Sequence, residues 1–536
     1  MDERKAVESL VKKAKEAADL IKSHQGTIRL VTHFDTDGIS SGAIIVEALT
    51  RLGKSFHLSV IKQLNKEIIE ELSKEKYDMF IFLDLGSGQI DAIEEFLSKK
   101  KVIISDHHQL QGEPVSIFHV NPLDYGISEN ISGSGVSYLV ARGFGAANRD
   151  LSELAIVGAV GDSQVGSIGG NWGLLGMNKE ILKDAAEMKK IKVGKGLRLW
   201  GRNRRPIHKA LEYSVEVYIP GITNSESGSV QFLREIGIEL KKENGEWRTL
   251  SDLSSEEQKK LATGIIKERI RGNEENPDHI FGDIYDLSER KDFNDVGEFA
   301  TILNAMGKNM KAWVGIELCL KRPGIHETVN KIYAKYRRDI GRSLSWFEEN
   351  RYVLKERGNG YFILAGTHIP EHIISNVVSI LANSEFSEKP IFAFVDTEEG
   401  NVKISGRASD ELVDKGTNMM EMMKEAATAV GGEGGGHIGA AGATIPKGTE
   451  ERFISIVEEI LGKGTSGFLK EKTKLEQSKL LKEVDNGNKT DTKTDGKKAG
   501  SERGSKKREI KRKEGASEGE GIKKMEGKGL VRYFNP

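Results

Sequence analysis

The chain has 536 residues, of which 37% are hydrophobic and 30% charged, a balance typical of a water-soluble protein with several folded domains. No apolar run approaches the roughly 18–20 residues that a membrane-spanning helix requires, so we expect no membrane association. Cys319 is the only cysteine, which excludes disulfides within the chain and cysteine-rich zinc ribbons.

The formal net charge of −1 hides an asymmetry along the chain. From Lys463 onward, 21 basic and 12 acidic residues give a net charge of +9, which leaves −10 on the remaining body. The amino-terminal segment MDERKAVESLVKKAKEAADLIKS has the pattern of a charged amphipathic helix and lacks the apolar region of a signal peptide. We therefore expect the protein to work in a reducing interior compartment.

Short apolar stretches alternate with helical patterns over residues 1–190, which predicts an α/β domain built on a parallel sheet. The expected strands are 27–33, 77–84 and 101–105, and the expected helices are 40–53, 89–98, 133–147 and 151–161. Ligands of such sheets bind at the carboxyl ends of the strands. The polar clusters HFDTD (33–37), Asp84 and DHH (106–108) all lie at or just after a strand end.

The rest of the chain divides by composition and periodicity. Residues 191–305 lack this alternation of strand and helix patterns and are predicted to form an inserted, mostly helical domain. A connecting helix is expected to follow within 306–350. A second, smaller α/β domain is expected over 351–465, with strands 360–366, 390–396 and 401–407 and helices 371–384, 417–432 and 448–461. Residues 466–536 are rich in Lys, Glu, Gly and Ser and poor in aromatic residues, which predicts a disordered basic tail.

Two histidines and four aspartates occupy positions that the predicted sheet would bring together. They are His33, Asp35, Asp37, Asp84, His107 and Asp162. Carboxylate and imidazole ligands without thiolate suit Mn²⁺ or Mg²⁺ better than a structural zinc ion. Two such ions about 3.5–4 Å apart, bridged by one carboxylate, can activate water and stabilise the leaving oxygen of a phosphoester.

Each part of this set also has a purely structural interpretation. Asp35 and Asp37 can be turn or N-cap residues before the first helix, and Asp84 can be a turn residue before LGSG. Asp162 can simply end a helix, and the DHH triplet can be a hydrogen-bonded polar loop. Because all of them fall at successive strand ends, a metal centre explains the set better than several unrelated turns.

The order of these motifs resembles the DHH phosphoesterases, a family named for the triplet at 106–108. The matching stretches are VTHFDTDGISSG (31–42), FLDLGSG (82–88), SDHH (105–108) with Asn121-Pro122, and VGAVGDSQ (157–164). ISGRAS (404–409) and GGGHIGAAG (434–442) are similar to the DHH-associated domain of that family. The resemblance covers roughly residues 25–460.

The resemblance implies a role for each residue of the set. One metal ion would be held by His33, Asp35 and Asp84. The second would be held by Asp37, Asp84, His107 and Asp162, so that Asp84 bridges the two. Asp106 would orient a ligand, and His108 would reach the scissile phosphate.

The glycine-rich stretch GGEGGGHIGAAG (431–442) lacks the Lys-Ser/Thr pair of a P-loop. The candidate substrate-binding residues in and around it are Gly434, Gly435, Gly436, His437, Arg407 and, from the first domain, His108. Glycines allow a phosphate to approach the backbone, and an arginine can donate two hydrogen bonds to it. The alternative is an ordinary glycine-rich turn with a surface arginine, whereas the resemblance implies a clamp across the cleft between the domains.

The insert carries the basic stretch WGRNRRPIHKA (200–210), which can hold a phosphate backbone beside a stacking platform. The candidate nucleic-acid contacts are Trp200, Arg202, Arg204, Arg205 and Lys209, and the alternative is a solvated charged turn. RNRRPIHKALEYS, FLREIGIEL, GEWRTLSDLS and EFATILNAMGK resemble the archaeal branch of the RecJ-like single-strand exonucleases. That resemblance implies single-stranded DNA or RNA as the substrate and the GINS complex of the replicative helicase as a partner.

The basic tail ends in GKGLVRYFNP, with Leu530, Tyr533 and Phe534. This ending is similar to a sliding-clamp-binding peptide, although Gly527 stands where such peptides usually have glutamine. The run GSKKREIKRKEG in the same tail can bind nucleic acid through its charge alone, and the alternative is a solvated linker.

These features together predict a two-metal-ion phosphodiesterase that acts as a single-strand-specific exonuclease on DNA, with RNA as a further substrate, in replication or repair. His108, Arg407 and His437 would stabilise the charge that develops on the phosphate. Two alternatives stay open: a phosphoesterase of short oligonucleotides or cyclic dinucleotides, and a non-catalytic scaffold of the replicative helicase. We expect a cytoplasmic, nucleoid-associated location.

Overall fold

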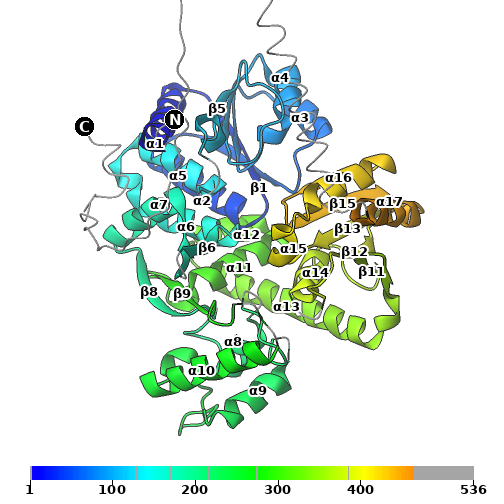
Figure 1. The fold of residues 1–536 in the computed structure, drawn as a ribbon. Coiled ribbons are helices and arrows are strands. Elements are labelled where there is room, and N and C mark those ends of the chain that lie inside the picture. The colour runs from blue at the N-terminus through cyan, green and yellow to red at the C-terminus, as the bar shows by residue number, and fades with distance from the viewer. Residues whose placement is uncertain are drawn as a thin grey trace, which may run out of the picture.

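The computed structural model describes residues 3–462 except 128–130, 169–170, 200, 215–216, 224, 273, 275 and 384–385. Figure 1 shows an amino-terminal α/β unit in blue and cyan, a helical insert in green and a carboxyl-terminal α/β unit in yellow and orange. The long helix α13 (Ile325–Glu349) runs along the carboxyl-terminal unit. Every helix in the described part of the chain is too short or too polar to cross a membrane.

The amino-terminal unit is built on a five-stranded sheet with the strand order β2-β1-β3-β4-β5. Its strands are β1 (Ile28–His33), β2 (Phe56–Ile61), β3 (Met79–Leu83), β4 (Lys101–Ser105) and β5 (Phe118–Val120). All neighbouring strands pair in parallel, with His33 beside Ile61 and Leu83 beside Ser105. The predicted parallel sheet is confirmed, and the carboxyl ends of its strands meet at one edge.

Alternating side chains of the central strand β3 enter two separate cores. Phe80 and Phe82 point to the face that α3 (Lys66–Ser73) and α4 (Ile90–Leu97) cover. Ile81 and Leu83 point to the opposite face. That face is covered by α1 (Glu3–Ser23), α2 (Thr36–Arg51), α5 (Gly133–Phe144) and α6 (Ser152–Gly161).

Several elements of this unit differ from the sequence prediction. The strand β2 was missed because its sequence FHLSVI mixes polar and apolar residues and its side chains are only partly buried at the sheet edge. The helix expected at 40–53 begins earlier, at Thr36. The side chain of Asp35 accepts a hydrogen bond from Gly38 N at 3.0 Å and caps the helix at this point.

A small sheet with the strand order β6-β7-β9-β8 forms the base of the insert. Its strands are β6 (Val165–Ile168), β7 (Asn171–Leu174), β8 (Ile191–Leu197) and β9 (Phe281–Leu287), with α7 (Gly176–Glu187) between β7 and β8. The helices α8 (Ile207–Glu212), α9 (Glu226–Glu235) and α10 (Ser255–Arg271) pack around an apolar core of their own. The insert is mostly helical, as expected, but the strands at its base were not predicted.

The chain returns to the first unit directly after β9, earlier than the predicted boundary at 305. The helix α11 (Val296–Lys308) packs against α2 and α6, and α12 (Ala312–Cys319) packs against α2 and α11. The helix α13 then contacts α11, α12 and the carboxyl-terminal unit. Residues 296–349 therefore join the two α/β units rather than extending the insert.

The carboxyl-terminal unit has a six-stranded mixed sheet with the order β10-β11-β12-β13-β15-β14. Its strands are β10 (Leu354–Arg357), β11 (Gly360–Gly366), β12 (Ile391–Asp396), β13 (Asn401–Arg407), β14 (Glu433–Gly436) and β15 (Ala440–Pro446). Its helices are α14 (Ile374–Ala382), α15 (Asp410–Asp414), α16 (Met419–Ala429) and α17 (Glu450–Gly462). The face with α16 and α17 has a separate core, whereas α13 and α14 cover the other face. The glycine-rich stretch forms the hairpin of β14 and β15.

Candidate metal centre

The first group of candidate ligands gathers at the carboxyl ends of β1 and β3. The Nδ1 atom of His33 lies 3.1 Å from Asp35 Oδ2 and 3.6 Å from Asp84 Oδ2. Asp84 follows β3 and has a φ of 58°, a left-handed conformation that residues other than glycine rarely adopt. One ligand atom of each residue lies within 4.8 Å of the other two, so a single cation can contact all three.

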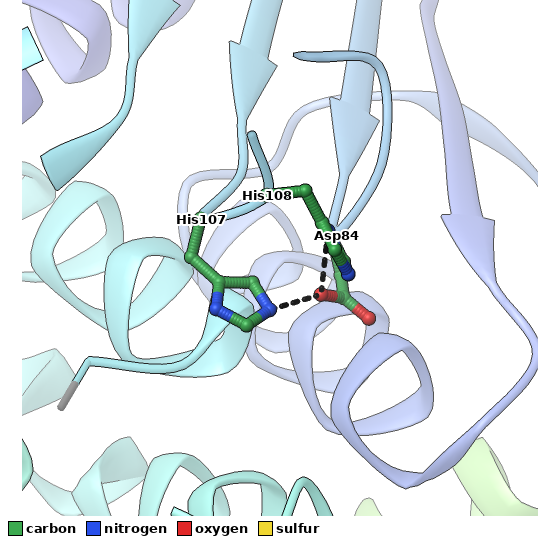
Figure 2. A group of neighbouring side chains, drawn as sticks. All are labelled: Asp84, His107 and His108. Atoms are coloured by element: carbon green, nitrogen blue, oxygen red, sulfur yellow. Dashed lines mark ion pairs between the residues drawn. The ribbon is translucent and has the colours of Figure 1, made fainter. Parts of the chain in front are cut away.

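The second group comes from the start of α2, the DHH loop and the end of α6. The Nε2 atom of His107 lies 3.7 Å from Asp162 Oδ2 and 3.9 Å from Asp37 Oδ2. The same nitrogen lies 3.5 Å from Asp84 Oδ1, and Figure 2 shows the His107 ring pointing at that carboxylate. Asp84 therefore faces both groups, with Oδ2 toward His33 and Oδ1 toward His107. All six predicted ligands lie together.

Three ligand atoms are buried without a hydrogen-bond partner among the described residues. They are His33 Nδ1, Asp84 Oδ1 and His107 Nε2. Unpaired polar atoms inside a protein are unfavourable, and a cation bound among them would remove that penalty. Imidazole nitrogens and carboxylate oxygens without sulfur form a donor set that fits divalent ions such as Mn²⁺ and Mg²⁺. The site therefore has the features of a divalent-metal site.

The pKa values of Asp37 and His107 indicate that the site favours positive charge. Burial raises the pKa of Asp37 well above its usual value, and the carboxylates of Asp84 and Asp162 raise it further. Burial alone would lower the pKa of His107, but the carboxylates around it, Asp84 foremost, raise it to about 10. The raised pKa values of Asp37 and His107 favour their protonated forms where no metal is bound, and a divalent cation would displace these protons.

Two glycines allow helices to approach the carboxylates closely. Gly133 begins α5, where a Cβ atom would lie 2.3 Å from Asp84 Oδ1, and its backbone N donates to Asp37 Oδ2 at 2.6 Å. In α6, a Cβ atom on Gly158 would lie 2.3 Å from Asp37 Oδ1. A side chain at either position would push the helix away from the ligands. Neither glycine was predicted as a site residue.

Asp106 holds the loop that carries the two histidines. Its Oδ1 accepts a hydrogen bond from His107 N at 2.8 Å and lies 2.7 Å from His108 Nδ1, while its Oδ2 accepts from Ser87 N at 3.0 Å. Burial would raise the pKa of Asp106, but His108 and these hydrogen bonds hold it far below its usual value. Asp106 is thus a positioning residue, and the other ring nitrogen of His108 stays available for a substrate.

Gln164 is a site residue that the sequence analysis missed. Its Nε2 donates to Asp162 Oδ2 at 2.8 Å and lies 3.3 Å from His107 Nδ1. Its Oε1 accepts from Asn178 Nδ2 at 2.6 Å, so the amide is fixed at both ends. Gln164 therefore orients two ligands of the second group, although an uncharged amide gave no signal in the sequence.

We expect Gln164→Ala to weaken Mn²⁺ binding by roughly 10- to 100-fold, the usual effect of removing a group that orients metal ligands. Titration calorimetry with Mn²⁺ measures the change. Gln111→Ala is the matched control, because Gln111 is an exposed glutamine in the loop that follows the DHH triplet. Equal Mn²⁺ affinity in Gln164→Ala and the wild type would contradict this role.

The carboxyl-terminal unit places Arg407 and His437 on the opposite side of the site. Arg407 Nε donates to Ser379 Oγ and its Nη1 to Gly406 O, both at 2.8 Å, and no acidic side chain pairs with it among the described residues. Burial lowers the pKa of Arg407 to about 10, so it stays charged at neutral pH. The ring centre of His437 lies 6.0 Å from that of His108. Burial, with the charges of the DHH histidines, lowers the pKa of His437, which favours a neutral hydrogen-bonding ring.

The glycines before His437 do not share one role. A Cβ atom on Gly434 would lie 2.4 Å from Met423 O, so close packing of β14 on α16 is sufficient reason for this glycine. Gly435 has open space around it, and Gly436 has a φ of 138°. Substrate binding by Gly434, Gly435 and Gly436 stays a prediction.

Lys308, the last residue of α11, is a second residue that the sequence analysis missed. Its Nζ donates to Ser375 Oγ at 3.0 Å and to Asn376 Oδ1 at 2.6 Å, both on α14. Burial, together with the nearby charge of Arg407, lowers the pKa of Lys308 to about 7. No acidic side chain forms an ion pair with Lys308 in the described part of the chain. Lys308 and Arg407 therefore place two basic side chains without acidic partners, among the described residues, where α11 meets the carboxyl-terminal unit.

The basic stretch of the insert holds the insert to the rest of the chain. Arg202 is buried and pairs with Asp286 at 2.6 Å and with Asp295. Arg205 Nε lies 2.8 Å from Glu298 Oε1, and its Nη2 donates to Tyr333 OH at 2.6 Å. The predicted nucleic-acid contact is therefore wrong for Arg202 and Arg205, because partners inside the protein occupy both guanidinium groups.

The other predicted contacts of this stretch also have internal partners or lie outside the described residues. The guanidinium of Arg204 lies 4.8 Å from the centre of the Phe293 ring, and Lys209 forms ion pairs with Glu212 and Glu226. Outside the described residues lie Trp200, the tail 466–536 and its predicted docking residues Leu530, Tyr533 and Phe534.

Three family models match the chain in the order of its units. They are the N-terminal domain of the DHH family (27–161), the DHH-CID domain (199–279) and the DHHA1 domain (358–463). An uncharacterized protein of Methanocaldococcus jannaschii is 34% identical over 476 residues, which cover 86% of this chain and 99% of that protein. The chain belongs to the DHH family. Five of the six candidate ligands lie in the DHH match and the sixth, Asp162, directly follows it, whereas α8–α10 lie in the DHH-CID match.

Within the DHH family, the chain is RecJ-like. The single-stranded-DNA-specific exonuclease RecJ of Thermus thermophilus is 26% identical over 222 residues, 39% of this chain and only 32% of that protein. The structure of T. thermophilus RecJ with Mn²⁺ has the same fold over 84% of this chain and 55% of that chain (TM-score 0.53, 18% identity). CDC45 of Entamoeba histolytica also has the same fold, over 84% of this chain and 98% of that chain (TM-score 0.57, 13% identity).

Proposed function

We propose that this DHH-family protein is a two-metal-ion phosphodiesterase that acts as a single-strand-specific exonuclease on DNA, with RNA as a further substrate, in replication or repair. The observation that carries the proposal is the placement of Asp84, whose two carboxylate oxygens face separate groups of ligands. One ion, Mn²⁺ or Mg²⁺, would be held by His33, Asp35 and Asp84. The second would be held by Asp37, Asp84, His107 and Asp162.

Divalent ions held by these residues would supply a nucleophile at neutral pH and stabilise charge on the leaving oxygen. The side chains of the protein position the strand. Asp106 fixes Nδ1 of His108, so the other ring nitrogen can hydrogen-bond an oxygen of the scissile phosphate. Lys308 and Arg407 attract the phosphates of the strand into the cleft between the α/β units. The likeness to a single-stranded-DNA-specific exonuclease supports the choice of substrate.

Digestion of single-stranded DNA and RNA, labelled separately at each end, tests the proposal. Stepwise release of nucleotides from one end is expected with Mn²⁺, and none with EDTA or in the His107→Ala variant. The labelled end that is lost first gives the polarity. If neither polymer is cut with Mn²⁺ or Mg²⁺, the exonuclease proposal is wrong.

Arg407→Gln is expected to lower kcat/KM on a DNA strand by roughly 10- to 100-fold, the value of one lost charge-assisted hydrogen bond to phosphate. The Mn²⁺ affinity should not change, because Arg407 is not placed among the ligands. Steady-state kinetics and Mn²⁺ calorimetry separate the two effects. Arg452→Gln on the exposed face of α17 is the control and should behave as the wild type. An unchanged kcat/KM in Arg407→Gln would remove Arg407 from the substrate site.

A second candidate function is a non-catalytic scaffold of the replicative helicase, which the shared fold with CDC45 favours. Such a scaffold has no need of a metal, so Mn²⁺ calorimetry on the wild type and His107→Ala distinguishes the candidates. Tight Mn²⁺ binding that is lost in His107→Ala supports the nuclease, whereas no binding in either protein supports the scaffold.

We further propose that the protein associates with the GINS complex, because the chain resembles GINS-associated nucleases and shares its fold with CDC45. Co-elution with purified GINS in size-exclusion chromatography tests this partner, and separate elution at micromolar concentration would contradict it. The sliding clamp as a partner and the cytoplasmic, nucleoid-associated location stay predictions.

A further inference from the structure

A mostly apolar pocket of about 370 Å³ lies beside the metal centre. Residues after β1, at the end of β2, at the end of α11 and on α12 line it, among them Phe34, Val60, Lys62, Met310, Trp313 and Glu317. Trp313 is 53% exposed and Met310 is 71% exposed, although both are large and apolar. Large apolar side chains left open at a pocket commonly mark a binding site.

The pocket is continuous with the first group of metal ligands. Phe34, which lines the pocket, is flanked in the chain by His33 and Asp35, and its ring packs edge-on against His33 with 4.8 Å between ring centres. Ile61 of β2, a further lining residue, pairs with His33 of β1 in the sheet. Because adjacent strands lie about 4.8 Å apart, the pocket opens at the same carboxyl edge of the sheet as the ligands.

Two lysines connect the surroundings of the pocket to the carboxyl-terminal unit. Gly307 lines it, and a Cβ atom there would lie 1.8 Å from Phe34 O, so only glycine fits at this contact. The next residue is Lys308, which reaches from α11 to α14 of the carboxyl-terminal unit. Lys62 at the pocket pairs with Glu371 of the carboxyl-terminal unit at 2.6 Å. A phosphate held at the cleft would therefore lie next to an apolar, aromatic pocket.

Size and chemistry together indicate the occupant. A volume of this order is that of a small-molecule site, which accommodates one flat ring system rather than a helix or an extended peptide. Trp313 offers an aromatic face for stacking, and the Glu317 carboxylate can accept a hydrogen bond from a base N–H group. Lys308 beside the pocket suits the phosphate that follows a base in a nucleic-acid strand.

We propose that this pocket binds a nucleobase of the bound strand, with Trp313 as the stacking face, while the phosphate next to that base lies at the metal centre. The proposal rests on the proposed function, because it deepens the description of the same substrate. Base–aromatic stacking is sequence-tolerant, so the pocket would hold the strand by one base without reading its sequence.

Equilibrium binding of the full chain to single-stranded DNA tests the pocket. The probes are a fluorescent oligothymidine of about ten residues and a series in which one nucleotide at a time is replaced by an abasic residue. Fluorescence anisotropy is measured in EDTA, so that no strand is cut. At one position of the series, the wild type should bind the abasic strand roughly 5- to 100-fold more weakly than the intact strand.

Trp313→Ala should bind the intact strand as weakly as the wild type binds that abasic strand, and should not distinguish the two strands. Trp247→Ala is the matched control, because Trp247 is an exposed tryptophan of the insert, 46% exposed, and should retain the preference. If Trp313→Ala binds and discriminates like the wild type, the proposal is overturned. If Trp313→Ala changes the oligomeric state in light scattering but leaves strand binding unchanged, the surface is a protein contact and the proposal is also overturned.

The same strands in Mn²⁺ distinguish this proposal from the proposed function. A wild type that discriminates between the strands through Trp313 but leaves the intact strand uncut supports the base pocket and contradicts the exonuclease. A wild type that cuts both strands and binds them equally supports the exonuclease and overturns the base pocket.

Discussion

Asp84→Ala is expected to lower the rate of strand hydrolysis by at least about 10³-fold. The variant removes the one carboxylate that faces both ligand groups. Metal-ion catalysis stabilises the transition state by several kcal/mol, and each 1.36 kcal/mol corresponds to about a tenfold change in rate. The thermal response to metal should change as well. At 100 times the dissociation constant, Mn²⁺ should stabilise the wild type by about 2.7 kcal/mol, and most of this effect should be lost in the variant.

The control for Asp84→Ala is Asp396→Ala, which removes an aspartate at the end of another strand. Asp396 pairs with Lys447 at 2.9 Å in the carboxyl-terminal unit, far along the chain from any candidate ligand. Because this ion pair is at the surface, the free energy of unfolding should fall by less than about 1 kcal/mol. Hydrolysis and the stabilisation by Mn²⁺ should match the wild type. Retained Mn²⁺ stabilisation in Asp84→Ala would contradict the bridging position of this residue.

Arg205→Ala is expected to destabilise the attachment of the insert by about 3–5 kcal/mol, because it leaves the buried carboxylate of Glu298 without its partner. The Glu298 side chain is only 3% exposed, and Arg205 also donates to Tyr333 on α13. Hydrogen exchange should therefore accelerate in the helices α8–α10 of the insert. Mn²⁺ affinity should not change, since no metal ligand is touched.

The double variant Arg205→Ala with Glu298→Gln should recover part of the lost stability, because no buried charge is left unpaired. Lys209→Ala is the control, as its ion pairs with Glu212 and Glu226 lie in a more exposed part of the insert. It should change the free energy of unfolding by less than about 1 kcal/mol. A stable Arg205→Ala variant that binds single strands tenfold more weakly would instead show that Arg205 contacts nucleic acid.

The candidate metal centre was predictable from sequence because most of its ligands lie at or shortly after strands with a continuous apolar pattern. β1 and β3 are buried along nearly their whole length, so their ends, and the acids and histidines after them, were readily located. Parallel strands then bring these ends to one edge whatever the details of packing. The order of the motifs along the chain was therefore sufficient to predict that they converge in space.

The surroundings of the centre were not predictable in the same way. Gln164 acts through its hydrogen bonds to Asp162 and Asn178, and Gly133 through its hydrogen bond to Asp37 and its close approach to Asp84. Neither residue has a charge or a place in a hydrophobic pattern that marks it in the sequence. Lys308 lies at the end of a helix, where a lysine is ordinary, and only the approach of α14 gives its Nζ atom the partners Ser375 and Asn376. Such roles follow from tertiary contacts between segments far apart in the chain.

The basic stretch of the insert shows the opposite error. Four cationic residues within eight positions suggested a surface for phosphates, but the acidic partners of Arg202 and Arg205 lie elsewhere in the chain. Asp295 and Glu298 at the start of α11 face Arg202 and Arg205 once β8 and β9 return the chain to the first unit. Charge patterns along a sequence do not show whether the neutralising partner comes from a distant segment.

Diffraction from crystals grown with Mn²⁺, recorded at the manganese absorption edge, tests the two-metal centre most directly. Two anomalous peaks are expected, one near His33 and Asp35 and one near His107 and Asp162. They should lie about 3.5–4 Å apart on either side of the Asp84 carboxylate. A single peak remote from Asp84, or no peak in crystals soaked at millimolar Mn²⁺, would contradict the proposed centre.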